Sequence, residues 1–331
     1  MNGRSLSSGS PVLRENVTFL LPIRNGEKWV LDILSDIVAM SQGGDEIIAV
    51  DDGSTDKTLI MLNKFKSQMK LTILNSQGRG LVEALNLGIT ESNTEWIARV
   101  DVDDKHSPLR IEEQMKVIQE DTVAVFSDYE IVSEEDRSLG VIYSPIFDIA
   151  IKLAILRSER IAHPSALLRK SAVLKAGGYL KSEFPCEDLG LWIRLSKLGS
   201  FSSISSTHLR YRLISGSVST SRYQDAKEKT KLLTSGNYPK LICQDITLKE
   251  ISNVLKHYKE LPDSAQRQVL FLRDILNPKL KTYLGTKMRM YSQMRLLLLL
   301  IWPGNFYCIF EMIYYRAIRR IYRNKIGSRK I

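Results

Sequence analysis

The chain has 331 residues, more than one average domain, and its 47 Lys and Arg residues against 37 Asp and Glu residues give a formal net charge of +10. Its three cysteines, Cys186, Cys243 and Cys308, are odd in number, far apart and without metal-ligand spacing, which excludes a disulfide framework and indicates a reducing compartment. Residues 1–10 are polar and lack the apolar core of a signal peptide, so we expect a cytoplasmic protein. No recognised nucleic-acid-binding motif accompanies the positive charge, so we expect no nucleic-acid partner.

Apolar runs that predict β-strands alternate with helical patterns through the first half of the chain. The predicted strands are residues 17–21, 46–50, 71–74, 96–100 and 123–126. The predicted helices between them are residues 29–40, 57–65, 81–89 and 109–119. This α/β alternation predicts a mainly parallel sheet with helices on both faces, and right-handed crossovers place the carboxyl ends of the strands at one edge. After residue 126 the pattern is less regular, and residues 127–139 are polar and acidic.

Polar residues follow three of these strands, at the edge where ligands bind in an open α/β sheet. They are Arg24, Asn25 and Glu27 after the first strand, Asp51–Asp56 after the second, and Arg99–Asp104 after the fourth. Three carboxylates within four positions of the last segment repel one another unless a divalent cation lies between them, so this segment predicts a hard metal with oxygen ligands. A solvated acidic turn is the alternative. In the second segment Gly53 can take a positive φ and Ser54 or Thr55 can cap the next helix, so turn chemistry explains part of it.

These segments resemble motifs of the inverting GT-A glycosyltransferases of family 2, which build bacterial capsule, O-antigen and other surface polysaccharides. Four blocks match in order: Pro22–Glu27 (P-x-x-N-x-E), Asp51–Asp56 (D-D-G-S-T-D), Gly80–Ile89 (G-L-x-x-A-L-N-x-G-I) and Arg99–Asp104 (R-x-D-x-D-D). A fifth block, on the acceptor side, comprises His163-Pro164-Ser165, Arg169, Gly177–Tyr179, Glu187-Asp188 and Trp192. The similarity covers residues 16–221, roughly two thirds of the chain.

The resemblance implies a GT-A fold, Rossmann-like and typical of nucleotide-diphospho-sugar transferases, with a basic helical extension at the C-terminus. The implied parts are a flexible N-terminus (1–15), a nucleotide-sugar-binding half (16–126), an acceptor-binding and catalytic half (127–225) and the helical extension (226–331).

The resemblance also implies roles for the donor-side residues. Asp52 would hydrogen-bond the base, and Asp101 and Asp103 would hold the ribose and a Mn²⁺ or Mg²⁺ ion, with Asp104 next in line as a ligand. Further donor-binding residues are Pro22, Arg24, Glu27, Arg79 and Arg99. Arg79 lies in the loop after strand 71–74, where the family often has a basic group, and a solvated loop arginine is the alternative.

Glu187 and Asp188 begin a predicted helix that continues to residue 198. By resemblance, Asp188 is the general base that takes the proton of the acceptor hydroxyl, and Glu187 positions the acceptor. The alternative is that both acids only favour the first turn of a helix through its dipole. His163 and Trp192 match acceptor-side positions. For His163 a hydrogen-bonded structural role is the alternative, and Trp192 is also a candidate for the core.

Many relatives read Y-R-x-H after this helix, and the His supplies another metal ligand. Here Ile214 stands in that position, so Ser215, Ser217, His208 or water are the candidates to replace it. We expect Arg212, together with Arg210, to be available to the donor phosphates.

The C-terminal third combines apolar residues with a basic end. Residues 296–301 and 306–315 are largely apolar, and seven positive charges without an acid follow, namely Arg316, Arg319, Arg320, Arg323, Lys325, Arg329 and Lys330. Pro303, Gly304 and Glu311 count against a membrane-spanning helix. The pattern predicts an interfacial helix on an anionic membrane surface. A core-packed helix with a solvated tail is the alternative.

We therefore predict a metal-dependent inverting glycosyltransferase that is peripheral to the inner face of the cell membrane. Its donor is a nucleotide-sugar, with a UDP-sugar as first choice on family frequency, and its acceptor is a lipid-linked or polysaccharide molecule. A nucleotidyltransferase of related fold is one alternative, although its expected Gly-rich basic loop is missing from Pro22–Glu27. A catalytically silent peripheral membrane scaffold is the other.

Overall fold

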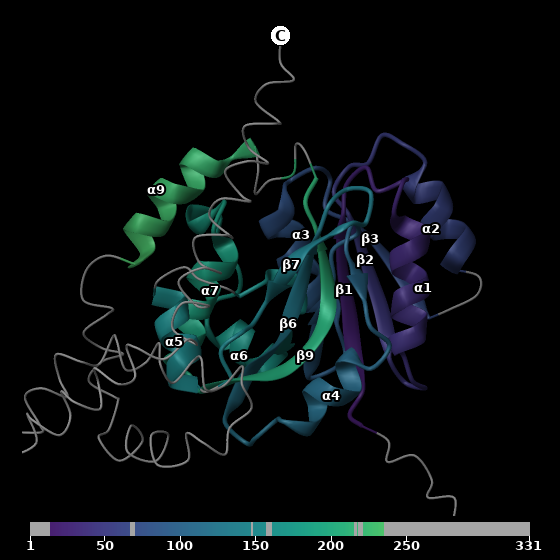
Figure 1. The fold of residues 1–331 in the computed structure, drawn as a ribbon. Coiled ribbons are helices and arrows are strands. Elements are labelled where there is room, and N and C mark those ends of the chain that lie inside the picture. The colour runs from purple at the N-terminus through teal and green to yellow at the C-terminus, as the bar shows by residue number, and fades with distance from the viewer. Residues whose placement is uncertain are drawn as a thin grey trace, which may run out of the picture.

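The computed structural model describes residues 14–66, 70–146, 148–156, 161–214, 217 and 221–234. These residues build one nine-stranded sheet with helices packed on it (Figure 1). The strands are β1 (Val17–Ile23), β2 (Glu46–Asp51), β3 (Leu71–Asn75), β4 (Trp96–Arg99), β5 (Lys105–His106), β6 (Thr122–Val132), β7 (Ser138–Ile142), β8 (Leu167–Arg169) and β9 (Ser200–Arg212). The helices are α1 (Val30–Met40), α2 (Thr58–Lys66), α3 (Leu81–Glu91), α4 (Arg110–Lys116), α5 (Asp148–Leu156), α6 (Lys170–Lys175), α7 (Glu187–Leu195) and α9 (Tyr223–Thr234), with 3-10 turns η1 (His163–Ser165) and η2 (Lys181–Glu183).

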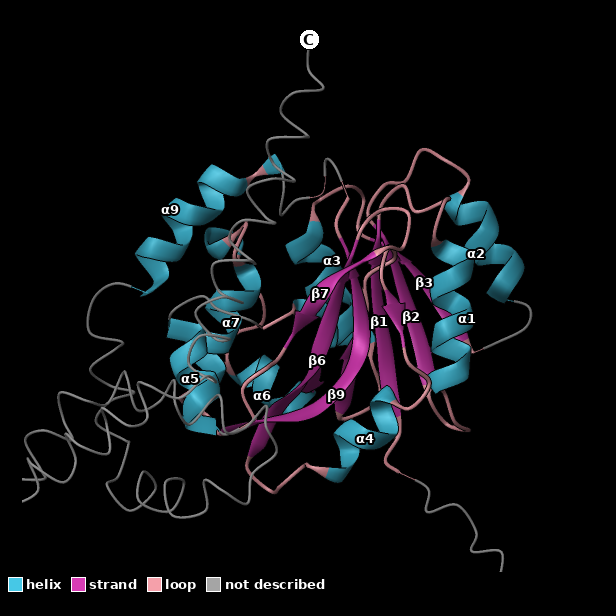
Figure 2. Ribbon diagram, viewed as in Figure 1, coloured by secondary structure: helices cyan, strands magenta, loops and turns pink. Residues whose placement is uncertain are grey.

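The sheet runs in the order β3-β2-β1-β4-β8-β6-β9-β5, and β7 pairs with β6 beside this path (Figure 2). The strands of the first half, β1 to β4, pair in parallel, as the βαβ pattern predicts. The second half mixes both directions, because β6 and β9 are parallel whereas β8 pairs antiparallel with β4 and β6. The parallel half therefore presents the carboxyl ends of β1, β2 and β4 at one edge.

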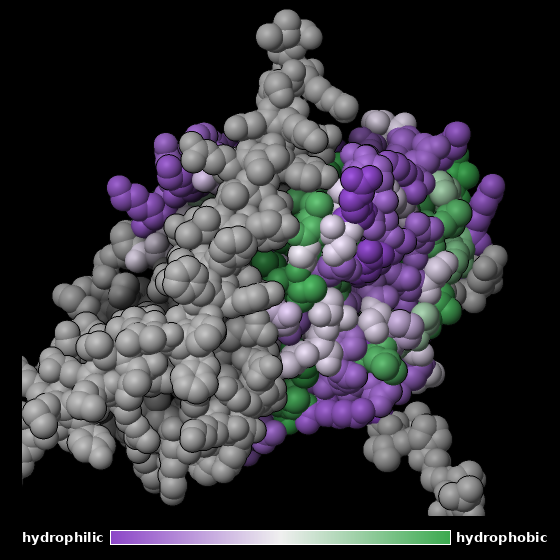
Figure 3. All heavy atoms as spheres, viewed as in Figure 1, coloured by the Kyte–Doolittle hydropathy of each residue, from purple (hydrophilic) through white to green (hydrophobic). Residues whose placement is uncertain are grey.

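Helices cover both faces of the sheet, as the sequence predicts (Figure 2). One buried apolar cluster joins the sheet to α3, α5, α6 and α7. A second cluster, on the other face, joins it to α1, α2 and α4. Large apolar side chains that remain exposed on α1 and α2 are Leu31, Val38 and Ile60, and hydrophobic atoms gather on that side of the view in Figure 3.

The packing of α3 on the sheet depends on a glycine in the G-L-x-x-A-L-N-x-G-I block. A Cβ atom at Gly88 would lie 2.1 Å from Cδ1 of Leu20 on β1. Only the absence of a side chain lets the helix approach β1 this closely. This glycine therefore serves packing and does not indicate ligand contact.

The strands and helices predicted before residue 126 are all present, with shifted ends. The helix predicted at 109–119 is shorter and spans Arg110–Lys116. The larger difference lies in the segment taken as irregular, because β6 continues to Val132 and β7 follows it. β6 continues because it pairs with β9 along its whole length, a long-range partner that local periodicity does not reveal. β6 therefore runs across the predicted division at residue 126.

The C-terminal part is described as far as α9, where Cys186 of the α7 N-terminus contacts the carbonyl of Ala226 at 3.4 Å. Among the described residues no helix is both long and apolar enough to span a membrane. The predicted interfacial segment at 296–315 and its basic end lie outside the described residues.

Candidate active site

The ends of β1 and β2 form a rigid loop pair at the ligand-binding edge of the sheet. Residue 23 of β1 lies beside residue 51 of β2 in the parallel register. Beyond them, the backbone N–H of Asn25 donates to Ser54 Oγ at 2.9 Å, and Asn25 Oδ1 accepts from the N–H of Thr55 at 2.8 Å. Gly53 takes φ +77°, the turn conformation that the sequence predicts. The P-x-x-N-x-E and D-D-G-S-T-D blocks therefore brace each other.

Asp52 is buried at this edge and fixed by two donors. Its Oδ1 accepts hydrogen bonds from Ser76 Oγ at 2.6 Å and from the N–H of Gly80 at 3.0 Å. The backbone N–H of Asp52 donates to the carbonyl of Ile23 at 2.8 Å. Asp52 is thus held in one orientation by β1 and by the loop after β3, as a group that must recognise a ligand needs to be.

The other donor-side candidates lie around Asp52 with different degrees of freedom. Pro22 is buried in β1, whereas Arg24 and Arg79 are exposed. Nε of Arg79 donates to the carbonyl of Ser76 at 2.9 Å. This bond keeps the guanidinium of Arg79 near Ser76, the residue whose hydroxyl binds Asp52. Glu27 pairs instead with Nζ of Lys57 at 3.3 Å. The donor contacts expected of these residues stay predictions.

The acidic loop, defined as Asp101–Asp104, gathers three carboxylates. One oxygen atom each of Asp101, Asp103 and Asp104 lies within 4.8 Å of the others. Burial and the charge of Asp101 raise the pKa of Asp103 to about 6, and burial with the charges of Asp103 and Asp101 raises the pKa of Asp104 well above its usual range. Ionising the cluster is therefore costly without a compensating cation.

The donor set fits a divalent metal. Asp104 is buried, and its Oδ1 accepts from the N–H of Arg212 at 2.8 Å. Its Oδ2 has no hydrogen-bond partner within the described part of the chain, although buried carboxylate oxygens are normally satisfied. Clustered carboxylate oxygens are the ligands that Mg²⁺ and Mn²⁺ prefer. Asp101, Asp103 and Asp104 are thus the residues that could hold such an ion.

Arg99 ends β4 and connects this cluster to the second group of acids. Its buried guanidinium forms an ion pair with Asp101. Its carbonyl accepts from the buried Arg110 of α4 at 3.0 Å, and its N–H donates to Ala166. These two bonds hold the backbone of Arg99, and the ion pair with Asp101 holds its guanidinium.

The second group is Glu187 and Asp188 at the start of α7. Burial, followed by the charge of Asp188, raises the pKa of Glu187 to about 7, and burial also raises the pKa of Asp188. The charge of Arg99 opposes both increases, and the charge of Asp101 adds to them. Glu187 and Asp188 therefore lie within electrostatic range of Arg99 and Asp101.

The two acids of α7 differ in their contacts. Oδ1 of Asp188 accepts from the N–H of Leu189 at 2.7 Å, a local bond of the first helical turn, so helix-terminal capping explains part of its position. Oε2 of Glu187 is buried without a partner among the residues that the structure places. Capping does not explain this orphaned oxygen, and an incoming acceptor hydroxyl could donate to it.

A histidine–tyrosine pair includes His163, for which the sequence predicts a place on the acceptor side. Nε2 of His163 lies 2.7 Å from the hydroxyl of Tyr179, and burial holds the pKa of His163 well below its usual range, so the imidazole is neutral. Trp192 packs edge-on against His163 and Phe126, with ring centroids 5.8 and 5.2 Å away. Trp192 is thus a buried core residue next to the site, and its acceptor contact stays a prediction.

Asn86 is a residue for which the sequence predicts no role. Its Nδ2 donates to the carbonyl of Tyr179 and its Oδ1 accepts from the N–H of Tyr179, each at 2.8 Å. A Cβ atom at Gly178, which has φ +68°, would lie 2.6 Å from Asn86 Oδ1. The asparagine of the G-L-x-x-A-L-N-x-G-I block therefore fixes the G-G-Y block and, through Tyr179, His163. The place of Asn86 inside a family motif block is the sequence signal that could have drawn attention to it.

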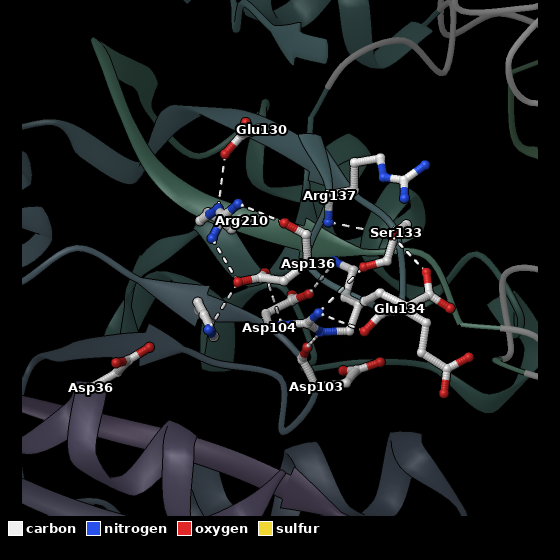
Figure 4. Close-up of polar contacts among 12 residues, drawn as sticks. Asp36, Asp103, Asp104, Glu130, Ser133, Glu134, Asp136, Arg137 and Arg210 are labelled. Carbon is white, nitrogen blue, oxygen red and sulfur yellow. Dashed lines mark hydrogen bonds and ion pairs between the residues drawn. The ribbon is translucent and has the colours of Figure 1, made fainter. Parts of the chain in front are cut away.

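Arg212 and Arg210 are engaged in protein contacts. The side chain of Arg212 is buried and donates to the carbonyls of Asp103 and Glu134, each at 2.9 Å. Arg210 pairs with Glu130 at 2.8 Å (Figure 4). We expected both arginines to be available to phosphates. Their described contacts are structural, and a phosphate contact stays a prediction.

Ile214 stands where many relatives have a His metal ligand. Among the described His, Cys, Asp and Glu residues, no replacement for that ligand clusters with the acidic loop. Nε2 of His208 lies 2.8 Å from Glu113 of α4, and the cluster of possible ligands contains only the three aspartates of the acidic loop. Ser215 lies outside the described residues.

Comparisons with known proteins agree with this geometry. Residues 18–178 match the family described as glycosyl transferase family 2. An uncharacterized glycosyltransferase of Haemophilus influenzae is 28% identical over 57% of this chain and 72% of its own. The poly-beta-1,6-N-acetyl-D-glucosamine synthase of Staphylococcus aureus is 27% identical over 56% of this chain and 47% of its own. The match to an uncharacterized glycosyltransferase of Rickettsia bellii spans only 29% of that protein.

Solved structures show the same fold. TarS 1–349 of S. aureus, in complex with UDP-GlcNAc, has a TM-score of 0.57 at 16% identity and covers 77% of this chain and 78% of its own. The mannosyltransferase PcManGT of Pyrobaculum calidifontis, in complex with GDP-Man and Mn²⁺, has a TM-score of 0.51 at 15% identity. The similarity covers 94% of this chain and 88% of that one. The sheet is therefore that of a GT-A glycosyltransferase. Residues 18–178, just under half of the chain, are the part that is similar to glycosyl transferase family 2.

Proposed function

We propose that this chain is a metal-dependent inverting glycosyltransferase that moves a sugar from a nucleotide-diphosphate donor to an acceptor hydroxyl. One observation carries the proposal. The Glu187–Asp188 pair lies close enough to Arg99 and Asp101 for their charges to shift its pKa values, and the acidic loop and this pair each contain a buried carboxylate oxygen that no described residue satisfies. A site that stabilises a leaving diphosphate on one side and accepts a proton on the other needs this arrangement.

On the donor side, Asp52 binds the base, and Asp101 and Asp103 bind the ribose and the metal, with Asp104 as a further ligand. A bound Mn²⁺ or Mg²⁺ supplies the positive charge that neutralises the leaving diphosphate. Arg99 keeps Asp101 oriented through their ion pair. Pro22, Arg24, Glu27 and Arg79 complete the donor side in the proposal.

On the acceptor side, Asp188 takes the proton of the acceptor hydroxyl. The hydroxyl oxygen then forms a bond to the anomeric carbon from the face opposite the nucleotide, and the diphosphate leaves with the electron pair of the broken bond. Glu187 orients the hydroxyl through its unpaired Oε2. The neutral His163–Tyr179 pair and Trp192 border the acceptor. Burial raises the pKa of Asp188, and a raised pKa makes a carboxylate a stronger base.

A UDP-sugar is our first choice of donor, and a lipid-linked or polysaccharide acceptor in cell-surface polysaccharide synthesis is our choice of target. The complex of TarS with UDP-GlcNAc and the similarity to the poly-N-acetylglucosamine synthase support this choice. The complex of PcManGT with GDP-Man keeps GDP-sugars as the competing donor class.

A thermal-shift screen of UDP-, GDP- and dTDP-sugars with Mn²⁺ tests the donor. A ligand at about 100 times its Kd stabilises the fold by about 2.7 kcal/mol. We expect a UDP-sugar to raise the Tm only when Mn²⁺ is present and to be hydrolysed slowly. Binding without hydrolysis or transfer favours the silent scaffold, and transfer of a nucleotidyl group favours the nucleotidyltransferase.

The acceptor and the location are tested with anionic vesicles. The basic residues after position 315 would each contribute about 1 kcal/mol near such a surface. We expect the full chain to sediment with anionic liposomes at low salt, and truncation after Lys287 to abolish sedimentation while sparing donor hydrolysis. Failure of the full chain to sediment contradicts the peripheral membrane assignment alone.

A further inference from the structure

The turn between β6 and β7, defined as Ser133–Arg137, is a well-ordered element packed against the acidic loop (Figure 4). The N–H of Ser133 donates to the carbonyl of Arg137 at 2.8 Å, and the N–H of Asp136 donates to the carbonyl of Ser133 at 3.0 Å. Asp136 has φ +67°, a left-handed conformation that few non-glycine residues adopt. The turn therefore places this one carboxylate at a backbone cost, which the surrounding contacts must offset.

Asp136 collects three cationic side chains. Its carboxylate lies 3.0 Å from Nζ of Lys105, 2.9 Å from Nη1 of Arg210 and 3.2 Å from Nη2 of Arg212. Lys105 directly follows Asp104 in the chain, and the two arginines belong to the end of β9. Asp136 thus links the exit of the acidic loop to the strand that runs beside it.

Arg212 transmits this link to the acids themselves. Its backbone N–H donates to Asp104 Oδ1 and its Nε donates to the carbonyl of Asp103. Its Nη1 donates to the carbonyls of Ser133 and Glu134 in the turn, at 3.3 and 2.9 Å. Its guanidinium also lies over the ring of Trp29, 4.5 Å from the centroid. One buried side chain therefore clamps the acidic loop to the turn.

The two arginines depend on Asp136 to different degrees. Arg210 also pairs with Glu130, so it keeps a carboxylate partner without Asp136. Among the described residues, the guanidinium of Arg212 forms an ion pair only with Asp136. A buried guanidinium that loses its counter-charge is strongly unfavourable, so neutralising Asp136 should release the Arg212 clamp first.

We propose that Asp136 is a positioning residue that, through Arg212 and Lys105, holds the acidic loop in the arrangement that binds a divalent cation. The inference rests on the proposed metal-dependent transfer. Three mutually repelling carboxylates separate when nothing holds them, and the clamp opposes this separation from outside the ligand set. Residues that orient metal ligands without contacting the metal typically change metal affinity by about 10- to 100-fold when they are replaced.

The test is a Mn²⁺ titration in the presence of UDP, or of GDP, with free Mn²⁺ followed by electron paramagnetic resonance. Asp136→Asn keeps the shape of the side chain and removes its charge, and we expect it to raise the Mn²⁺ Kd about 10- to 100-fold. At saturating Mn²⁺ its kcat should return to nearly the wild-type value. Glu135→Gln is the matched control, because it removes the same charge from the same turn and its carboxylate accepts from Ser133 Oγ. We expect it to leave the Kd within about 2-fold.

Arg212→Lys provides an independent variant in case Asp136→Asn does not fold. It keeps the backbone bond to Asp104 and loses the guanidinium fork. We expect a similar loss of Mn²⁺ affinity, and the double variant should lose little more than either single one, because both act through one clamp. Unchanged Mn²⁺ affinity in a folded Asp136→Asn or Arg212→Lys protein overturns the inference alone. A wild-type chain that binds Mn²⁺ with neither nucleotide overturns the proposed function together with the inference.

Discussion

The acids after β4 and the acids at the start of α7 are within electrostatic range of each other but are held in different ways. The acidic loop is surrounded by cations: Arg99 pairs with Asp101, and Arg212 binds Asp103 and Asp104 through its side chain and backbone. Asp188 accepts a local bond from the N–H of Leu189, and no described residue satisfies Oε2 of Glu187. Burial raises the pKa of both acids, as it does for Asp103 and Asp104. The first arrangement suits groups that remain ionised around a metal, and the second suits groups that exchange a proton.

The largest expected effect comes from breaking the donor side of this comparison. Asp103→Asn removes a carboxylate from the cluster, and we expect it to abolish transfer, by at least about 1000-fold, since several kcal/mol of charge stabilisation are lost. Nucleotide binding should lose its Mn²⁺ dependence. The Tm of the metal-free protein should stay unchanged or rise, because repulsion with Asp101 is relieved. Steady-state assays and thermal unfolding measure both effects.

The control for this variant is Asp121→Asn, at an exposed acid outside the cluster. It should leave transfer and Mn²⁺ dependence unchanged. Near wild-type turnover of Asp103→Asn, after EDTA treatment and with Mn²⁺ restored, would show that Asp103 is not a metal ligand.

The next effect separates proton transfer from donor binding. Asp188→Asn keeps the size of the side chain but cannot accept a proton, so kcat should fall about 10²- to 10⁴-fold with donor affinity intact. Glu187→Gln is the informative partner, because a positioning role for Glu187 predicts a smaller fall in kcat and a larger change in acceptor KM. Loss of donor affinity together with turnover in Asp188→Asn would move Asp188 to the nucleotide side of the site.

The pH dependence of stability sharpens the contrast between the two groups. The pKa of Glu187 rises from 4.5 to about 7 in the fold, so the folded state holds a proton that the unfolded chain releases. This contribution to stability is complete below about pH 4.5 and is lost as the pH rises through 7. Between pH 5 and 8 we expect it to decrease by about 2 kcal/mol.

Chemical denaturation of the wild type and of Glu187→Gln at several pH values measures how much the Glu187 proton contributes to the free energy of unfolding. The wild type should lose stability relative to the variant as the pH rises. Parallel pH profiles of the two proteins would mean that Glu187 titrates in the fold as it does in solution.

A smaller effect is expected where the two motif blocks join. Asn86→Ala leaves the N–H and carbonyl of Tyr179 without their partner, so the free energy of unfolding should fall by about 1 to 3 kcal/mol. Asn63→Ala is the matched control, because the amide of Asn63 bonds only to the carbonyl of Leu59 within its own exposed helix face. We expect about 0.5 kcal/mol or less for the control. Equal losses in both variants would remove the proposed link between Asn86 and Tyr179.

The sequence predicts the polar edge of the parallel half of the sheet well because its signals are local. Three apolar strands of the first half are each followed within a few residues by a polar group, and parallel strands bring such groups together whatever the details of packing. Asp101–Asp104 and Glu187–Asp188 could therefore be placed from periodicity and motif similarity, and the start of α7 at Glu187 agrees with that placement.

The sequence does not predict contacts between distant segments. Residues 127–139 read as a polar, irregular stretch, because their order comes from the pairing of β6 with β9. Asp136 in this stretch is one acid among several until Lys105, Arg210 and Arg212 surround it. Arg212 reads as a free cation for phosphates, and only the fold shows that it is buried against Trp29 and the turn.

Isothermal titration calorimetry of UDP and GDP, with Mn²⁺ and then with EDTA, tests the central claim most directly. That claim is that the acidic loop binds a divalent metal together with a nucleoside diphosphate. The account predicts that at least one of the two nucleotides binds with Mn²⁺, that EDTA abolishes this binding, and that Asp103→Asn loses the Mn²⁺-dependent part. Absence of binding for both nucleotides in Mn²⁺, or equal binding in Mn²⁺ and EDTA, would contradict it.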